Sequence, residues 1–410
     1  MNILVLQETD WLTRGPNTQH HIFERISRNS NIRITVLDYD IDKLMRSKSI
    51  FIKHHSYSNI QRAVDNSKIN LIRTAHIQVP YLRRISSLIT NFFGMLKLFR
   101  KNRPDIIYGF SLTNGIIGLF LSKLYGIPYI FYYIDKLHTL VPLQFVRKIA
   151  MFFSRLLFKY SDKIIVVTKL LQNYVLNEGS KPEKVILLLN GVSLENTVVN
   201  KDKLEILKKK YSIKENDFVL FFMGYFYEFA GLKEIIDYYN SDVVSGKLRF
   251  KFLLVGDGGI YNQLIKHCEK IKADWVYFTG RLPFFEITEY IELADLCLMS
   301  FDLNEITREI TPVKIMEYMA MKKPVLSNSL PGVVNEIGRD NGVIYAKNQI
   351  ELIKKIKPLS LDKEKLREIG KDGFRLIEKY YSWPIIINKF KNLLINQIKL
   401  KRSAYPSNFQ

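Results

Sequence analysis

The hydrophobic positions along the chain predict short buried strands that alternate with helical stretches. In the first half, near-continuous apolar runs occupy 3–6, 32–37, 105–110, 127–134, 163–168 and 185–189. A second series occupies 217–224, 250–256, 275–280, 293–301, 324–329 and 342–346. Stretches with helical periodicity separate the runs in both series. Fully apolar strands that alternate with helices are typical of parallel sheets covered on both faces.

The two series predict two doubly wound α/β domains, one at 1–195 and one at 196–380. The polar stretch 190–203 between them is the expected hinge. We expect 381–410 to form a C-terminal helix that packs back on the first domain and ends in a disordered tail. In open α/β sheets, ligands bind beyond the carboxyl ends of the strands. The site is therefore expected on loops after strands, in a cleft that the two domains face.

Composition is typical of a globular intracellular protein. Apolar residues make up 47% of the chain and charged residues 25%, which excludes a disordered chain. Cys268 and Cys297 both lie in apolar surroundings and are expected to be reduced thiols. The first residues predict a strand instead of a signal peptide, and no apolar run is long enough to span a membrane. We therefore expect a cytoplasmic protein.

The net charge of +21 predicts an anionic partner. Two stretches, 81–103 and 142–163, mix Arg and Lys with large apolar residues at helical spacing. Such helices suit peripheral contact with an anionic membrane at the inner face of the cell membrane. The alternative, helices packed on their own domain with a solvated basic face, fits the same pattern equally well. Nucleic acid is not expected, because no nucleic-acid-binding motif accompanies the charge.

The strongest chemical motif is a pair of carboxylates, Glu309 and Glu317, on either side of a predicted helix start. Pro312 suits the first helical position, and Thr311 suits the cap before it. Backbone amides at a helix start can bind a phosphate with the help of the helix dipole. The amides expected to do so belong to Thr311, Val313 and Lys314. A nucleotide sugar could be held between the two carboxylates.

This segment resembles the E-x7-E signature of glycosyltransferase family 4. Accompanying blocks resemble the same family in the same order, at 161–168, 189–192, 254–258, 278–280, 294–296 and 331–336. The resemblance covers roughly residues 1–385. It implies the GT-B fold, with an acceptor-binding N-terminal domain and a donor-binding C-terminal domain. It also implies retention of configuration and no metal or other cofactor.

The resemblance further implies roles for single residues. Glu317 would bind the ribose hydroxyls, and Glu309 would act as a catalytic residue on the donor sugar hydroxyls. The other expected donor-binding residues are Gly224, Arg281, Asn190, Pro312, Val313 and Lys314. Transfer would proceed by front-face displacement, with electrostatic stabilisation of the leaving phosphate as the main catalytic contribution.

One departure from the family pattern concerns the loop after 217–224. Family members usually carry an Arg and a Lys there that neutralise the diphosphate, whereas this chain has Tyr225 and Ala230. Two charge-assisted contacts, each worth about 1.5–3 kcal/mol, are then missing. Lys314, Arg308 or Arg281 are candidates to replace them. An unusual donor or low activity are the alternatives.

Candidate acceptor-side residues lie in the first domain. Arg14 and Gly15, in the loop after the first strand, are expected to contact phosphate. Asp135 and His138, just beyond 127–134, suit proton handling or the binding of sugar hydroxyls and are predicted to be catalytic. A packing or capping role is the alternative for each. The Asp-Tyr-Asp sequence at 38–40 is interpreted as a strand end and not as a metal site.

The predicted function is transfer of a hexose-type sugar from a nucleotide-sugar donor. The expected acceptor is a lipid-linked oligosaccharide or a cell-surface or protein glycan at the cytoplasmic membrane face. A sugar-nucleotide epimerase or hydrolase of the same architecture is one alternative. A non-enzymatic membrane- or glycan-binding derivative, favoured by Tyr225 and Ala230, is another.

Overall fold

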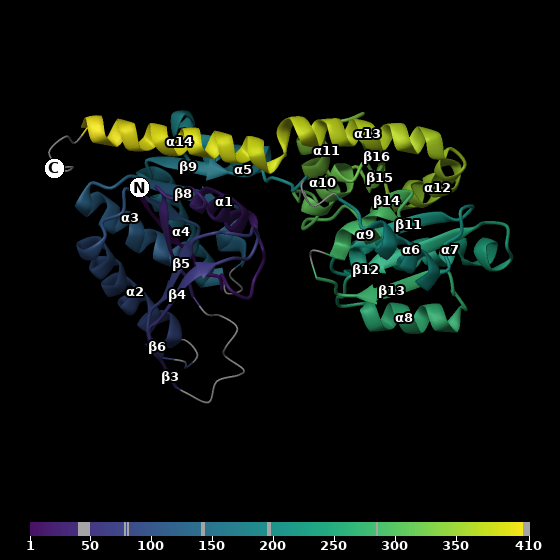
Figure 1. The fold of residues 1–410 in the computed structure, drawn as a ribbon, viewed down its shortest axis with the longest axis horizontal. Helices are drawn as coiled ribbons and strands as arrows, with labels where there is room; N and C mark the ends of the chain where they lie inside the picture. The colour runs from purple at the N-terminus through teal and green to yellow at the C-terminus, as the bar shows by residue number, and fades with distance from the viewer. Residues whose placement is uncertain are drawn as a thin grey trace. The chain divides into compact units, whose positions relative to one another are not determined.

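The chain folds into two compact units (Figure 1). The computed structural model describes residues 1–39, 50–77, 79, 82–140, 144–194, 198–283, 286–310 and 312–404, without the side chains of 84, 139, 140 and 401–404. The N-terminal unit comprises Met1–Asn190 with Ile386–Gln410, and the C-terminal unit comprises Gly191–Ile385. The chain therefore changes unit five residues before the position predicted from the sequence, and again within its last helix.

An eight-stranded sheet forms the centre of the N-terminal unit, in the order β10-β9-β8-β7-β1-β2-β5-β4. Its strands are β1 Asn2–Leu6, β2 Arg33–Leu37, β4 His55–Ile60, β5 Ile69–Arg73, β7 Ile106–Gly109, β8 Tyr129–Tyr133, β9 Lys163–Val166 and β10 Val185–Leu187. All neighbours pair in parallel except β4, which runs antiparallel to β5 at the edge. A separate antiparallel pair joins β3 (Phe51–Ile52) and β6 (His76–Ile77).

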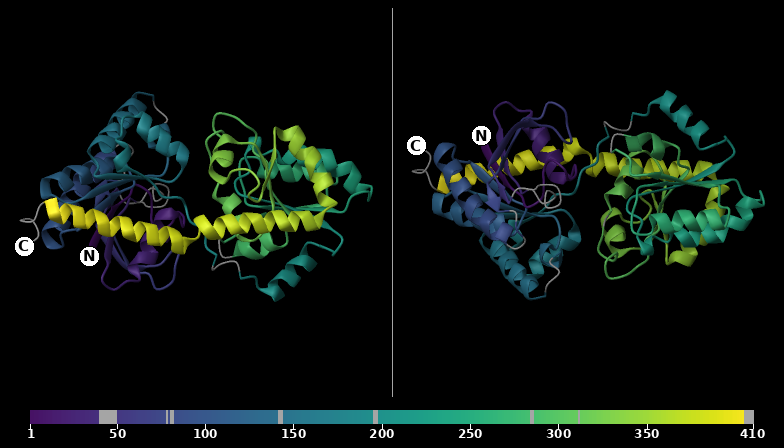
Figure 2. Two further views of the ribbon diagram at one scale, coloured as in Figure 1. Left: turned by 90° about the horizontal axis from the view of Figure 1, so that it is seen from above. Right: turned by 90° about the horizontal axis from the view of Figure 1, so that it is seen from below.

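Helices cover both faces of this sheet. They are α1 Thr18–Ser27, α2 Leu82–Lys101, α3 Thr113–Tyr125, α4 Gln144–Tyr160, α5 Lys169–Asn177 and α14 Trp383–Ala404. Helices α2, α3 and α4 connect β5 to β7, β7 to β8 and β8 to β9, and each of these connections runs toward the β10 edge of the sheet. Because parallel crossovers are right-handed, the three helices lie on the same face. The step from β1 to β2 runs the other way and places α1 on the opposite face. There Phe390 of α14 packs against Phe23 of α1, with ring centroids 5.7 Å apart, so α14 covers this face (Figure 2).

The C-terminal unit contains a six-stranded, fully parallel sheet in the order β13-β12-β11-β14-β15-β16. Its strands are β11 Phe218–Met223, β12 Phe250–Val255, β13 Val276–Gly280, β14 Leu296–Met299, β15 Val325–Asn328 and β16 Val343–Ala346. Its helices are α6 Lys201–Lys210, α7 Leu232–Val244, α8 Tyr261–Lys270, α9 Ile287–Glu292, α10 Val313–Ala320, α11 Pro331–Ile337, α12 Gln349–Ser360 and α13 Lys363–Tyr380. The predicted pair of doubly wound α/β domains is confirmed.

Each sheet has one place where the direction of winding reverses. In the N-terminal unit it lies between β1 and β7, and in the C-terminal unit between β11 and β14. The loops that leave two such strands diverge to opposite faces, and in folds of this kind ligands bind at the carboxyl ends of those strands. Across the described residues, no helix combines the length and apolar character needed to cross a bilayer.

Candidate active site

The backbone after β11 and the backbone after β12 pack closely against each other at the carboxyl ends of these strands. Gly224 follows β11 and Gly256 follows β12, and both have positive φ, +133° and +127°. A Cβ at Gly256 would lie 2.0 Å from the Gly224 carbonyl oxygen, so only glycine fits there. The two strand ends therefore approach each other without intervening side chains.

The side-chain ammonium of Lys314, a residue of helix α10, lies at this switch point. Its Nζ lies 4.4 Å from the ring centroid of Phe222 on β11 and 4.7 Å from that of Phe301, just after β14. A Cβ at Gly224 would come within 2.6 Å of this ammonium, so glycine at 224 leaves the space that Lys314 occupies. The two aromatic rings and the glycine fix the position of the charge.

Lys314 is the second residue of helix α10. The helix begins at Val313, and Pro312 is the N-cap residue with an extended ψ of 127°. The helix thus begins one residue later than predicted, and Thr311 lies outside the described residues. The first amides of a helix have no partner within the helix, so those of Val313 and Lys314 are available to a ligand.

Glu317 lies one turn further along α10. Both Lys314 and Glu317 are only partly exposed. Burial raises the pKa of Glu317 to about 7, although the charge of Lys314 opposes the shift. Burial likewise lowers the pKa of Lys314 to about 7, against the effect of Glu317. Such shifts toward neutrality are typical of sites that bind a charged ligand, and an incoming anion would restore the full charge of Lys314.

Glu309 lies on the exposed loop between β14 and α10. The backbone of this loop packs against the start of α11, where Gly332 N–H donates to the Arg308 carbonyl over 2.9 Å. A Cβ at Gly332 would lie 2.5 Å from the Ile310 carbonyl oxygen and 2.8 Å from that of Glu309. Gly332 is therefore a positioning residue for Glu309.

The residues that replace the usual Arg and Lys have different surroundings. Tyr225 is about half exposed and packs on Tyr227 with ring centroids 4.5 Å apart. Ala230 is fully buried, and its carbonyl accepts a hydrogen bond from Ser300 Oγ. Arg281 follows β13 and pairs at 3.2 Å with Asp257, at the exposed rim of the same edge. Of the candidate replacements, Lys314 packs on Phe222 and Phe301 at the switch point, whereas Arg308 is exposed on the loop after β14.

In the N-terminal unit, the loop after β1 is held by a buried ion cluster. Arg73 pairs with Asp10, and also with Asp38 at 2.8 Å. Asp38 also accepts from Trp11 N over 2.8 Å, which agrees with its interpretation as a strand end. Asp40 lies outside the described residues. Arg14 is exposed beyond this cluster, next to Gly15, whose φ is +89°.

The other predicted residues of the N-terminal unit are more scattered. Asp135 is exposed, whereas His138 is buried against the ring of Tyr174 at 5.9 Å, and burial lowers the pKa of His138. The two side chains thus face different surroundings. Asn190 Oδ1 accepts from Thr18 Oγ1 over 2.8 Å, within the N-terminal unit. Asn190 therefore belongs to a different unit from Lys314 and Glu317.

Phe222, Phe301 and Gly332 were not singled out from the sequence. The first two lie in or after apolar runs, where they are indistinguishable from core residues. Gly332 occurs in a block that was recognised, at 331–336, but its contact with the Glu309 loop depends on tertiary packing.

Comparisons with known proteins agree with this geometry. The family model described as glycosyl transferases group 1 matches residues 204–375, and the glycosyltransferase family 4 model matches residues 51–196. The chain is a group 1 and family 4 glycosyltransferase. Enzymes of this family are transferases, so the predicted family and enzyme class are confirmed.

Individual relatives of this glycosyltransferase are distant. An uncharacterized glycosyltransferase of Methanocaldococcus jannaschii is 28% identical over 316 residues, which cover 74% of this chain and 80% of the relative. The Escherichia coli UDP-Gal:alpha-D-GlcNAc-diphosphoundecaprenol alpha-1,3-galactosyltransferase is 26% identical over 206 residues, 45% of this chain and 50% of that protein.

Solved structures share the fold. The Anabaena protein HepE in complex with UDP has a TM-score of 0.71 at 15% identity, covering 97% of this chain and 100% of that one. WaaG, a glycosyltransferase of lipopolysaccharide biosynthesis, has a TM-score of 0.61 at 15% identity, covering 94% and 97%. The GT-B architecture predicted from the sequence is thus confirmed.

Proposed function

We propose that this glycosyltransferase transfers a hexose-type sugar, with retention of anomeric configuration, from a nucleotide-sugar donor to a glycan acceptor. The observation that carries the proposal is the position of Lys314. Its ammonium lies at the β11/β14 switch point, beside Gly224 and one residue inside the start of α10. A cation next to a helix start is suited to a diphosphate.

The surrounding residues suit the rest of a nucleotide sugar. In this proposal Glu317 accepts hydrogen bonds from the ribose, Glu309 contacts the donor sugar hydroxyls, and Arg281 lies toward the rim. The C1–O bond to the phosphate breaks while the acceptor oxygen bonds to C1 on the same face, and the acceptor proton passes to the leaving phosphate oxygen. Lys314 and the helix start, without a metal ion, balance the charge that develops on that phosphate.

The acceptor is proposed to be a lipid-linked oligosaccharide, or a cell-surface or protein glycan, at the cytoplasmic face of the membrane. The name of the E. coli relative supports this choice, because it gives a diphosphoundecaprenol-linked sugar as that enzyme's acceptor. The UDP bound to Anabaena HepE supports a uridine nucleotide as the donor's carrier. The N-terminal unit would hold the acceptor, with Asp135, His138, Arg14 and Gly15 as its candidate residues.

A two-step experiment tests the proposal. Thermal unfolding is first measured with a panel of UDP-, GDP- and ADP-sugars, because a bound donor raises the melting temperature. The stabilising donor is then incubated with a polyprenyl-diphosphate-linked N-acetylglucosamine, and the anomeric coupling of the product is measured by NMR. We expect one donor class to stabilise and the product to keep the donor's configuration. Stabilisation by no nucleotide sugar, or an inverted product, contradicts the proposal.

A further inference from the structure

Over its first three turns, helix α2 exposes apolar side chains and buries polar ones. The large apolar residues that face solvent are Leu82, Ile85, Ile89 and Phe93, with exposed fractions of 51%, 57%, 55% and 62%. The polar residues that face the unit are Arg83, Ser87 and Asn91, all buried. A helix that covers a sheet in water shows the opposite arrangement.

Hydrogen bonds specify this orientation. Asn91 Nδ2 donates to Asn114 Oδ1 on α3 over 2.9 Å. Ser86 Oγ accepts from Ile77 N over 3.0 Å, and Thr90 Oγ1 donates to Thr74 Oγ1 over 3.1 Å. Ser86, Thr90 and Asn91 thus have partners inside the unit, and rotation of the helix would remove these hydrogen bonds. The apolar stripe is consequently held outward.

Helix α4 also exposes large apolar residues, although the side chains that it buries are mostly apolar as well. Its outward apolar residues are Phe145, Val146, Ile149 and Phe152, with exposed fractions of 74%, 40%, 39% and 57%. Helix α3 packs between α2 and α4 and exposes Phe120 and Leu124 by 59% and 66%. These three neighbouring helices therefore all expose large apolar side chains, and an exposed apolar patch marks a binding surface.

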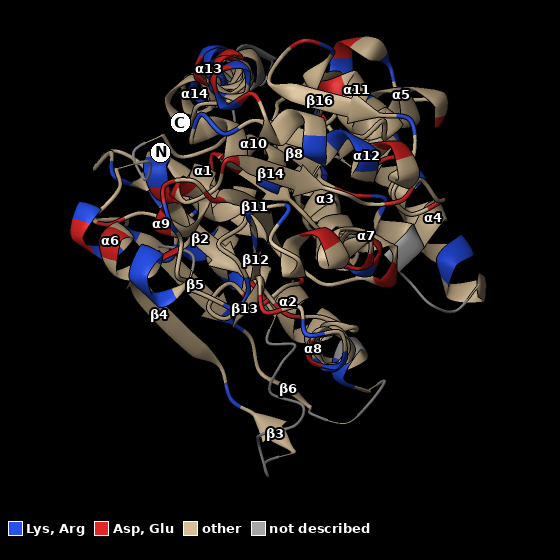
Figure 3. Cartoon of the chain, turned by 90° about the vertical axis from the view of Figure 1, so that its right-hand side faces the viewer, with Lys and Arg blue, Asp and Glu red and all other residues tan. Residues whose placement is uncertain are grey.

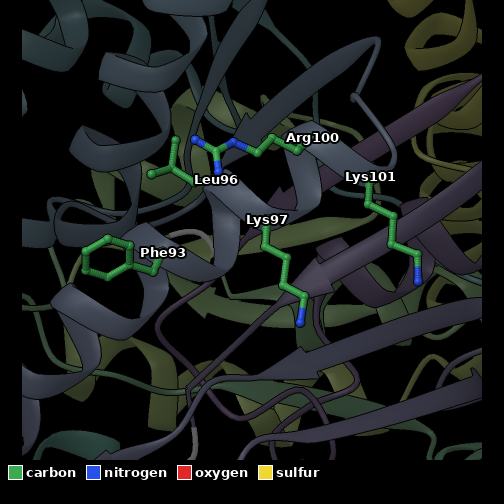
Figure 4. A pocket seen from close by; sticks show the side chains of 5 residues that line it. All are labelled: Phe93, Leu96, Lys97, Arg100 and Lys101. Carbon is green, nitrogen blue, oxygen red and sulfur yellow. The ribbon is translucent and has the colours of Figure 1, made fainter.

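The charge of these helices is of one sign. α2, α3 and α4 contain no Asp or Glu, whereas they contain five, one and four Lys or Arg residues, respectively. The basic residues of α4 are blue in Figure 3. On α2, a hollow of about 460 Å³ at the end of the apolar stripe is lined by Phe93, Leu96, Lys97, Arg100 and Lys101 (Figure 4).

We propose that the outer faces of α2 and α4 form a docking surface for an anionic lipid membrane. Apolar side chains would enter the boundary between headgroups and acyl chains, and the flanking Lys and Arg would contact lipid phosphates. A second copy of this chain is a poor occupant, because a symmetric interface would place basic residues against each other with no carboxylate on these helices to neutralise them. The proposal rests on the proposed function, in which the acceptor is lipid-linked.

Flotation of the full chain with vesicles tests the surface. Vesicles of phosphatidylcholine alone are compared with vesicles containing about one-third phosphatidylglycerol, to provide an anionic surface. The test variant is Phe93→Ser with Phe152→Ser. Its matched control is Ile206→Ser with Ile350→Ser, which removes side chains that are 64% and 66% exposed on α6 and α12 of the C-terminal unit. Melting temperatures confirm that both variants fold.

We expect the native chain and the control to bind anionic vesicles, and the Phe variant to bind on the order of tenfold more weakly. A second variant, Lys97→Gln with Arg100→Gln and Lys101→Gln, should lose most of the preference for anionic over neutral vesicles. Absence of vesicle binding, or equal binding by the Phe variant, overturns the proposal. So does a self-associated chain that the Phe substitutions convert to monomers.

An assay with a water-soluble acceptor that lacks the polyprenyl chain separates the two proposals. If docking alone is wrong, the enzyme transfers sugar to this acceptor but does not bind vesicles. If the proposed function is wrong, the chain binds vesicles but transfers no sugar to either acceptor.

Discussion

The switch points of the two sheets differ in charge and in what fills them. In the N-terminal unit, Glu8 follows β1 and accepts from the backbone N–H groups of Thr113 and Asn114 at the start of α3, over 2.7 and 3.1 Å. In the C-terminal unit, Gly224 follows β11 and leaves space for the ammonium of Lys314. One helix start is thus occupied by the protein's own carboxylate, whereas the other lies beside a cation. The same topology therefore places a carboxylate at a helix start in one unit and a cation beside a helix start in the other.

A second group of charges at the carboxyl ends of the N-terminal strands is also paired within the protein. Arg73, at the end of β5, is shared by Asp10 and Asp38, and all three side chains are nearly inaccessible to solvent. His20 extends this rigid loop, since its Nε2 lies 3.0 Å from the Trp11 carbonyl and its Nδ1 accepts from Asn17 N. Burial lowers the pKa of His20 to about 4, so it stays neutral.

The largest effect should follow from Asp38→Ala, which removes a buried carboxylate that pairs with Arg73. Breaking a buried ion pair costs about 3–5 kcal/mol, so the free energy of unfolding should fall by about that much. Nucleotide affinity should not change, because the cluster is structural. Chemical denaturation and calorimetry measure the two quantities. Asp242→Ala, which removes a partly exposed carboxylate with partners at 3.8 and 4.0 Å, is the control. A loss of affinity in folded Asp38→Ala would contradict the distinction between the edges.

The reverse result is expected for Lys314→Met. Loss of one charge-assisted contact to the diphosphate should weaken nucleotide-sugar binding by about 1.5–3 kcal/mol. Stability should not fall, because methionine fills the same space without a buried charge. Calorimetric titration of the stabilising donor measures the change, and Lys270→Met on α8 serves as the exposed control. Unchanged affinity would show that Lys314 does not replace the missing Arg and Lys.

A smaller effect is expected from Glu8→Ala. Removal of the carboxylate leaves the first amides of α3 without their acceptor, which should lower the free energy of unfolding by about 1–2 kcal/mol. Glu8→Gln keeps an acceptor oxygen and should recover part of the loss. Donor affinity should match that of the native chain in both variants, and weaker donor binding would mean that this switch point also belongs to the donor site.

The smallest effect concerns pH. Because Lys314 has a pKa of about 7 in the empty site, donor binding above pH 7 requires uptake of a proton. Affinity should therefore fall with rising pH, by at most tenfold per unit. Glu317, with a pKa also near 7, should cause a decrease below pH 7, because its ionised form is the better acceptor. Titrations from pH 6 to 8.5, spanning about one unit on each side of these values, should show a maximum near pH 7. A Lys314→Met variant that keeps the alkaline decrease would contradict the assignment.

Much of the fold was predictable from the pattern of apolar residues. All twelve predicted strands are present, because strands buried on both faces appear as continuous apolar runs. The strands that were missed, β3 to β6, are short or partly exposed. β4, for example, reads HSYSNI at the sheet edge, where one face needs no apolar residue.

The candidate site was only partly predictable. The order of motifs placed Glu309, Lys314 and Glu317 at one strand edge, because they surround a helix start. The selection of Lys314 over Arg308 and Arg281 required the packing of Phe222 and Phe301, which join the site from different strands. The outward stripe of α2 also required the structure, since periodicity shows that a helix has an apolar side but not which way that side faces.

The transfer rate of Glu309→Gln tests the central claim, that the C-terminal sheet edge carries the donor chemistry. Glu305→Gln is the matched control, because Glu305 is exposed on the same loop. With the stabilising donor and the lipid-linked acceptor, Glu309→Gln should lower kcat about 10²–10³-fold while donor affinity and melting temperature change little. Glu305→Gln should behave like the native enzyme. Equal transfer rates for the two variants would contradict the account.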